Sequence, residues 1–104
     1  MFRAAVVTIF GDAPVWDTLK GNLRYFAYGE EVCPTTGKEH KQAFCYAWKP
    51  NRFSAWKKLF PTAHIEQMRG NFRENEAYCS KESSLVEFGE KPNLHGEKKT
   101  LLDY

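Results

Sequence analysis

Several common kinds of site and scaffold are missing from this sequence. Its three cysteines, Cys33, Cys45 and Cys79, are widely spaced, odd in number and include no Cys-x-x-Cys pair. This spacing indicates neither a disulfide scaffold nor a structural zinc site, and reduced thiols in an intracellular protein are the simplest interpretation. No apolar run approaches the ~20 residues of a membrane span, and the start lacks a signal-peptide pattern, so we expect a soluble protein. A Gly-x-x-x-x-Gly-Lys-Ser/Thr motif is also missing, which excludes a P-loop ATPase within these residues.

An excess of charge of one sign is missing too. The 15 Lys and Arg residues nearly balance the 13 Asp and Glu residues, and the formal net charge is +2. A chromatin-type protein is far more basic, so we expect any nucleic-acid contact to be local. Aromatic residues, in contrast, make up 15% of the chain. A chain of 104 residues forms one domain, in which aromatic side chains are expected to fill the core and to line part of a working surface.

Hydrophobic patterns and chain breakers divide the sequence into eight predicted elements. Apolar and alternating runs predict strands over residues 3–10, 23–31, 39–48, 63–69 and 85–88. Helical spacing with Pro and Asn boundaries predicts helices over residues 15–20, over residues 52–60 and around residues 74–82. This order predicts an α+β fold of the split β-α-β, ferredoxin-like type, with an antiparallel sheet of about five strands and helices packed on one face. Nucleic-acid binders and nucleotidyl-transfer enzymes share this architecture, so the fold alone does not decide function.

The third predicted strand carries a chemically distinctive alternation. Residues two apart on a strand face the same way. Small residues that suit packing beneath helices share one face, namely Ala43, Cys45 and Ala47. The other, open face carries His40, Gln42, Phe44 and Tyr46. The helix over residues 52–60 likewise has an apolar stripe, formed by Phe53, Trp56 and Phe60 with Leu59 beside it.

His40 and Gln42 are predicted to lie beside a carboxylate of the preceding strand, Glu30 or Glu31. The turn between the two strands is short, so they are expected to form a hairpin. One carboxylate, one imidazole and one amide oxygen form a mostly hard ligand set, which suits Mn²⁺ or Mg²⁺ and leaves positions for a substrate phosphate. With a single charged ligand, the ion would stay an effective Lewis acid toward a phosphodiester. The alternative is an exposed polar sheet face beside a solvated strand end.

Tyr78 and Lys81 lie three residues apart in a predicted helix that no Gly or Pro interrupts. Residues at this spacing share a helix face, so the phenol and the ammonium can approach the same point. A phenol is a poor nucleophile at neutral pH because its pKa lies near 10. A nearby cation and a metal-bound electrophile would make it a usable one. The alternative is an ordinary surface helix, since Tyr-x-x-Lys is a common pattern.

The order and spacing of these motifs resemble a known family. Gly29-Glu30-Glu31, His40-Lys41-Gln42 and Tyr78-Cys79-Ser80-Lys81 are similar to the motifs of replication-initiator (Rep) endonucleases of small circular single-stranded DNA (CRESS-DNA) viruses. These enzymes belong to the HUH superfamily, and the chain looks most like the circovirus and nanovirus branch over roughly residues 22–90. Supporting similarity lies in residues 54–66, 69–70 and 86–90.

Two positions depart from the family pattern. The first motif usually reads Phe-Thr-Leu-Asn-Asn, whereas this chain has Val7-Thr8-Ile9-Phe10-Gly11. The residue between the two metal ligands of the second motif is normally hydrophobic, and here it is Lys41. A lysine on the helix-facing side is expected to lie at the sheet margin or to extend its ammonium to water.

The resemblance implies specific roles for the motif residues. Tyr78 corresponds to the nucleophile, and Lys81 to the lysine that helps to position the metal and the phosphate. Glu31, with Glu30 as the less favoured choice, would bind Mn²⁺ or Mg²⁺ together with His40 and Gln42. The implied activity is nicking and joining of single-stranded DNA at a viral replication origin through a 5′-phosphotyrosine, which initiates rolling-circle replication.

The expected partner is the single-stranded DNA of an origin stem-loop. The two aromatic residues on the open face could stack bases, and basic residues could neutralise phosphates. The predicted DNA contacts are Thr8, Phe44, Tyr46, Arg52, Lys57, Lys58, His64 and Arg69. For the basic residues, the alternative is an ordinary solvated helix face. His64 and Glu66 form a second pair at strand spacing, for which a structural or DNA-contacting role is favoured over metal binding.

The resemblance also implies a context for the chain. Residues 1–104 would be one nuclease domain, with residues 90–104 a tail that leads to a helicase domain in a longer viral protein of the host nucleus. We expect the isolated domain to be monomeric. Two alternatives remain open: a non-catalytic single-strand nucleic-acid binder with an RRM-like sheet, and a metal-dependent phosphodiesterase that uses water and does not need Tyr78.

Overall fold

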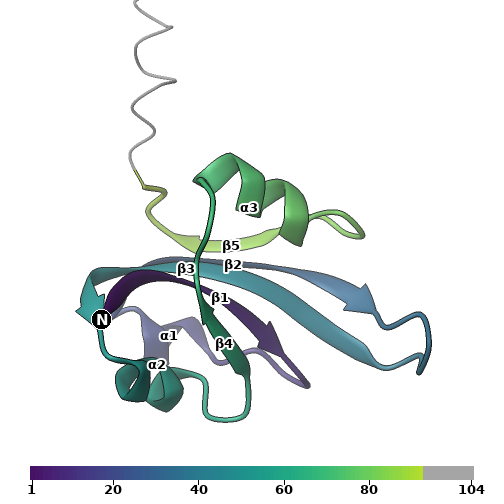
Figure 1. The fold of residues 1–104 in the computed structure, drawn as a ribbon, viewed down its shortest axis with the longest axis horizontal. Helices are drawn as coiled ribbons and strands as arrows, with labels where there is room; N and C mark the ends of the chain where they lie inside the picture. The colour runs from purple at the N-terminus through teal and green to yellow at the C-terminus, as the bar shows by residue number, and fades with distance from the viewer. Residues whose placement is uncertain (93–104) are drawn as a thin grey trace, which may run out of the picture.

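A five-stranded antiparallel sheet with three short helices forms the part of the chain that the computed structural model describes, residues 1–92 (Figure 1). The strands are β1 (Phe2–Ile9), β2 (Leu23–Val32), β3 (Glu39–Asn51), β4 (His64–Gln67) and β5 (Val86–Gly89). The helices are α1 (Trp16–Leu19), α2 (Phe53–Leu59) and α3 (Phe72–Cys79). Strand order is β4-β1-β3-β2-β5, with every neighbouring pair antiparallel. The predicted α+β class and element order are confirmed, while most of the predicted tail lies outside the described residues.

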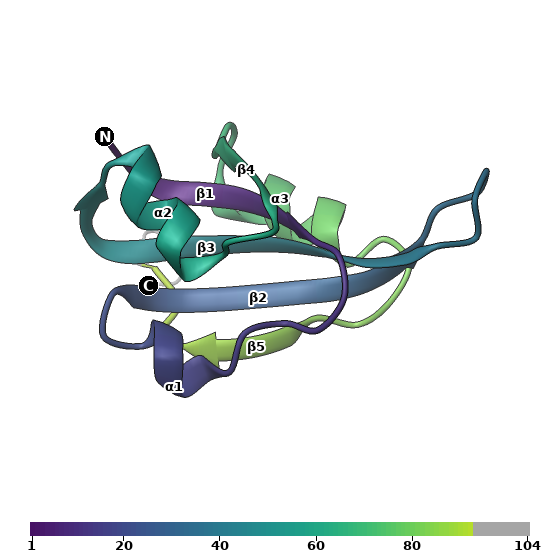
Figure 2. The ribbon, with the colours of Figure 1, turned by 90° about the horizontal axis from the view of Figure 1, so that it is seen from below.

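Helices cover both faces of the sheet, so the prediction that they share one face is wrong. α1 and α2 lie on one side of the sheet and α3 lies on the other (Figures 1 and 2). The first side buries the small β3 residues Ala43, Cys45 and Ala47, as predicted. On the other side, α3 buries Phe72 against an aromatic cluster that includes Phe44. Both faces of β3 are therefore core, and an open face remains only where α3 does not reach.

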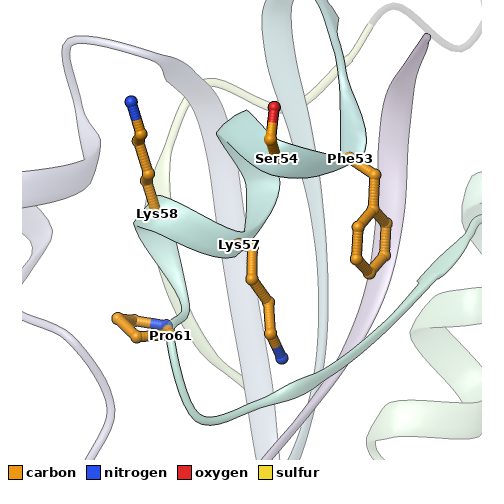
Figure 3. Close-up of a pocket in the computed structure, with 5 residues that line it drawn as sticks. All are labelled: Phe53, Ser54, Lys57, Lys58 and Pro61. Atoms are coloured by element: carbon orange, nitrogen blue, oxygen red, sulfur yellow. The ribbon is translucent and has the colours of Figure 1, made fainter.

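The core beneath α2 is organised by Trp56, which is fully buried. Its ring stacks on Phe2 with 5.6 Å between centroids, and its indole N–H donates to the Phe2 carbonyl at 3.1 Å. Phe60 is buried as well, which confirms this part of the predicted apolar stripe. Phe53 is not, since 53% of it is exposed. It is the first residue of α2, and its ring lines a surface pocket with Lys57 and other residues of this helix (Figure 3).

Candidate active site

The β2–β3 hairpin brings the predicted metal ligands together. Glu31 pairs directly with His40, and Gly29 pairs with Gln42 two residues further along the ladder. The three polar side chains therefore share one face of the sheet, the face that carries α3. His40 Nε2 lies 3.2 Å from Glu31 Oε1, and the Glu31 side chain is only 6% exposed. Glu30 pairs with Lys41 and points to the opposite face, so Glu31 is the carboxylate that accompanies His40 and Gln42.

A row of four paired residues crosses the sheet through Gln42. His64 pairs with Thr8, Thr8 pairs with Gln42, and Gln42 pairs with Gly29. The Thr8 hydroxyl donates to the Gln42 side-chain oxygen at 3.3 Å, so the amide of this buried glutamine is oriented by its neighbour on β1. His64 instead contacts the Glu66 carboxylate at 2.7 Å in an exposed pair on the edge strand.

Lys81 links the buried carboxylate to the candidate nucleophile. Its ammonium lies 2.5 Å from Glu31 Oε2 and 4.1 Å from the centre of the Tyr78 ring. Burial alone would lower the pKa of Lys81, but the hydrogen bond to Glu31 and the charge of that carboxylate outweigh it and raise this pKa. The ammonium therefore stays charged at neutral pH. Tyr78 itself is half exposed, so part of its side chain is accessible from solvent.

Helix α3 is anchored at both ends, which fixes Tyr78 relative to the sheet. At its start, the Asn71 side chain accepts from the Glu74 N–H at 2.9 Å and the Glu74 carboxylate accepts from the Asn71 N–H at 2.8 Å. These two bonds form a capping box. At its end, the Cys79 carbonyl lies against Gly29, where a β-carbon would come within 1.9 Å of the carbonyl oxygen. Only a glycine allows the last turn of α3 to sit this close to β2.

Lys81 lies beyond the end of α3, so the prediction that it shares a helix face with Tyr78 is wrong. The helix ends at Cys79, and the Ser80 hydroxyl donates to the Glu76 carbonyl at 2.7 Å. The following segment is fastened to β2, where the Glu30 N–H donates to Ser83 Oγ at 2.7 Å. This connection turns Lys81 back toward Glu31. The contact between the Lys81 ammonium and the Tyr78 ring therefore depends on the path of the chain after α3, and not on a shared helix face.

Comparison with known proteins decides the family. Residues 8–82, which include every residue of the site from Thr8 to Lys81, match the family described as "Putative viral replication protein". The chain belongs to this viral Rep family. The resemblance seen in the motifs is confirmed.

The relatives of this Rep-family chain include proteins of circoviruses, of a cyclovirus and of alphasatellites. It is 38% identical over 84 residues, or 80% of its length, to the Replication-associated protein of Human associated cyclovirus 1. It is 39% identical over 75 residues to the Replication-associated protein of Canary circovirus, and 38% identical over 71 residues to Para-Rep C2 of Milk vetch dwarf C2 alphasatellite. These alignments cover 72% and 67% of the chain. The matches span 30%, 26% and 25% of the three relatives, so the Rep-family chain corresponds to a part of each.

A divalent metal fits the donor set of the Rep-family site. Within residues 1–92, no three His, Cys, Asp or Glu side chains come together in a cluster that could hold a metal. Glu31 and His40 supply only two such groups, so an ion here would need the Gln42 amide oxygen as its third protein ligand. Two oxygens and one imidazole nitrogen suit Mn²⁺ or Mg²⁺ better than a softer metal.

The predicted base-stacking role of Phe44 is wrong. Its side chain is completely buried, and its ring meets that of Phe72 edge-on at 5.3 Å. Tyr46 is only partly accessible, because its ring stacks on Phe72 at 6.2 Å, and this burial raises the pKa of its phenol. Both residues belong to the cluster under α3, which a sequence-based prediction of an uncovered sheet face did not anticipate.

The basic residues of α2 lie on the side of the sheet opposite α3. Arg52, Lys57 and Lys58 accompany α2, and their role as phosphate contacts stays a prediction (Figure 2). Lys57 is also engaged, since its ammonium donates to the Ala63 carbonyl at 2.6 Å. Arg69, by contrast, is exposed just before α3, and its carbonyl accepts from the buried Asn75 of that helix. Its role as a DNA contact stays a prediction, as do those of Thr8 and His64.

Two residues near the site escaped prediction as functional groups. Phe10 is 58% exposed, and its ring centre lies 6.2 Å from that of His40. Lys41 donates from its ammonium to the Gly11 carbonyl at 2.9 Å, and it also lies 5.9 Å from the Tyr28 ring. Both residues occupy positions where the sequence departs from the family pattern. That departure is the feature of the sequence from which they could have been predicted to lie near the site.

Among residues 1–92, no helix is long and apolar enough to cross a membrane. The longest helix, α3, has eight residues.

Proposed function

We propose that this Rep-family domain nicks and joins single-stranded DNA at a viral replication origin, through a covalent 5′-phosphotyrosine on Tyr78. Membership of the family implies a role in replication initiation. The observation that carries the finer proposal is the position of the Lys81 ammonium, 2.5 Å from the buried Glu31 carboxylate and 4.1 Å from the Tyr78 ring. A phenol, a cation and a candidate metal ligand thus meet at one place.

Each residue of the site has a distinct task in this proposal. Glu31, His40 and Gln42 would hold Mn²⁺ or Mg²⁺, which when bound polarises a scissile phosphate as a Lewis acid. Lys81 is partly exposed, so its ammonium offers positive charge to the same phosphate as negative charge builds up on it. Tyr78 is half exposed and can be reached by a flexible single strand.

The proposed chemistry is a reversible exchange of one ester bond for another. The Tyr78 oxygen forms a bond to phosphorus while the bond from phosphorus to the 3′ oxygen breaks. Tyr78 loses its phenolic proton, and the departing oxygen gains a proton to become a free 3′-hydroxyl. Attack of a 3′-hydroxyl on the phosphotyrosine reverses the step and rejoins the strand. Because the bond energy is retained in the phosphotyrosine, joining needs no nucleotide cofactor.

A non-catalytic binder with an RRM-like sheet fits the structure less well. Such domains stack bases on aromatic residues of an exposed sheet face. Here α3 covers that part of the face, and Tyr25 and Phe44 are buried beneath it. The helix therefore removes the aromatic platform that such a binder needs, and it carries Tyr78, whose ring contacts the Lys81 ammonium.

The test is incubation with an origin-type single-stranded oligonucleotide and Mn²⁺, followed by denaturing electrophoresis. The parent domain is expected to form a covalent adduct, and Tyr78→Phe is expected to form none. Tyr46→Phe serves as a matched tyrosine control and should behave as the parent. Cleavage by Tyr78→Phe without an adduct would instead support a water-dependent phosphodiesterase. Unchanged cleavage by His40→Ala would contradict the metal assignment.

The proposal extends to the longer protein. Because the chain matches 30% or less of its relatives' length, we propose that the complete protein continues into a helicase domain. We further propose that residues 1–104 form one monomeric nuclease domain, that its partner is an origin stem-loop, and that it acts in the host nucleus.

A further inference from the structure

Phe10 places an exposed aromatic ring beside the candidate metal ligands. It directly follows Ile9, the last residue of β1, two residues after Thr8, whose hydroxyl bonds to Gln42, and its ring lies beside His40 on the face of the site. The ring is 58% exposed, and it lies 6.2 Å from the His40 ring with an angle of 44° between the two planes. One side of this phenyl group is thus supported by the site, and much of its remaining surface is open to solvent.

The turn after Phe10 is held by Lys41. Gly11 has a φ of 98°, a conformation that strongly favours glycine, so the chain turns sharply directly after the aromatic residue. The Lys41 ammonium donates to the Gly11 carbonyl at 2.9 Å, and it lies 5.9 Å from the Tyr28 ring on the other side of the sheet. The two departures from the Rep pattern are therefore in contact, and Lys41 fixes the turn that presents Phe10.

We propose that Phe10 is a base-stacking platform for the nucleotide next to the scissile phosphate, and that Lys41 is its positioning residue. The proposal rests on the proposed function, in which a single strand reaches Tyr78 across the face that carries His40. Every nucleobase has a π-face that can stack on an exposed phenyl ring. The site therefore holds this nucleotide by stacking and discriminates weakly between bases at this position.

The sequence-based candidates for base stacking are less accessible than Phe10. Phe44 is completely buried under α3, and Tyr46 is stacked on Phe72. Phe53 is nearly as exposed as Phe10, but it belongs to α2 on the far side of the sheet. Phe53 is therefore a matched control, because it is an exposed phenylalanine that a strand bound at the site does not reach.

The test measures binding of fluorescein-labelled single-stranded oligonucleotides by anisotropy, in a Tyr78→Phe background and without added divalent metal, so that the probe stays intact. The probe is an origin-type oligonucleotide, and a series replaces single nucleotides around the cleaved bond with abasic residues. Phe10→Ala is expected to weaken binding roughly 5- to 150-fold, the range measured for loss of one stacked base. Phe10→Trp should retain the affinity, and Phe53→Ala should bind as the parent.

Combining the variants with the abasic series separates stacking from a general loss of affinity. At one position beside the cleaved bond, removing the base should weaken binding of the oligonucleotide to the parent. Removing the same base should not weaken binding to Phe10→Ala any further, because the stacking contact is already lost there. Lys41→Met should reproduce part of the Phe10→Ala defect at that same position, and Lys41→Arg should bind the oligonucleotide as the parent does. Parental affinity in Phe10→Ala, or abasic effects that add to it at every position, would overturn the proposal.

The two proposals fail in different ways. If the parent domain formed no covalent adduct with DNA, the proposed function would fail, while the abasic series on a bound oligonucleotide would still decide whether Phe10 stacks a base. If the adduct formed and Phe10→Ala bound DNA as tightly as the parent, only the stacking proposal would fail.

Discussion

Replacing Lys81 with Met removes the cation from the site while keeping an unbranched apolar side chain against the Tyr78 ring. In the parent, Lys81 and His40 contact the two oxygens of Glu31, which is only 6% exposed. Removing one partner of a fully buried ion pair costs about 3–5 kcal/mol, whereas a fully exposed pair contributes at most about 1 kcal/mol. The Lys81 side chain is 43% exposed and His40 remains in place, so we expect a loss of about 1–2 kcal/mol.

The assay is thermal unfolding at pH 7 without added metal. A loss of this size corresponds to a melting temperature roughly 4–15 °C lower for a domain of this length. The pKa of Lys81 is raised above its ordinary value of 10.5, so the ammonium is charged at pH 7, and on the alkaline side the contribution of the pair is lost as the pH rises through that raised pKa. Lys58→Met, on the far side of the sheet, is the control and should leave the melting temperature unchanged.

A double-mutant cycle tests the physical reason for this loss. In a Glu31→Gln background the buried charge is gone, so Lys81→Met should cost much less than in the parent. An equal loss in both backgrounds would refute the ion-pair reasoning, as would a parental melting temperature for Lys81→Met.

Two further predictions concern the backbone and the thiols. Gly29→Ala should destabilise the domain by roughly 1–3 kcal/mol in urea denaturation, because the new β-carbon would overlap the Cys79 carbonyl. Gly21→Ala, which has no atom within 4 Å of the added carbon, should not, and equal effects would contradict the close packing of α3. Hydrogen bonds from Thr35 and Thr36 lower the pKa of the partly exposed Cys33 to about 6, so alkylation of Cys33 by iodoacetamide should be fast at pH 7 and slow below pH 6. Burial raises the pKa of Cys79 to about 12, so this thiol should react only on unfolding, and equal rates for the two thiols would contradict the structure.

Period-two alternation explains why the grouping of the candidate metal ligands could be predicted. On a strand the side-chain direction is strict, so His40 and Gln42 had to share a face. The short turn then fixed the hairpin, which left Glu31 or Glu30 as the carboxylate opposite them. The choice between the two required the register, in which Glu31 pairs with His40. The Thr8 bond to Gln42 depends on pairing between β1 and β3, and local patterns do not give the register of such distant strands.

The position of α3 could not be predicted from its own residues. It buries only Phe72, Asn75 and Cys79, so its sequence is that of a mostly polar helix. Which face it covers depends on the path of the chain from β4, a feature of tertiary structure. Assuming an open face then made Phe44 look available for base stacking. In the same way, the contact between Tyr78 and Lys81 arises from the connection to β2 rather than from three-residue helical spacing.

The central claim is that Tyr78 becomes linked to the 5′ side of the broken strand. An origin-type oligonucleotide with different labels at its two ends tests this most directly, after incubation with Mn²⁺ and digestion of the protein for mass spectrometry. We predict that the peptide containing Tyr78 carries DNA with only the 3′-end label, and that the 5′-end label is released on a fragment with a free 3′-hydroxyl. DNA attached to another residue, or cleavage that leaves both fragments free of protein, would contradict the claim.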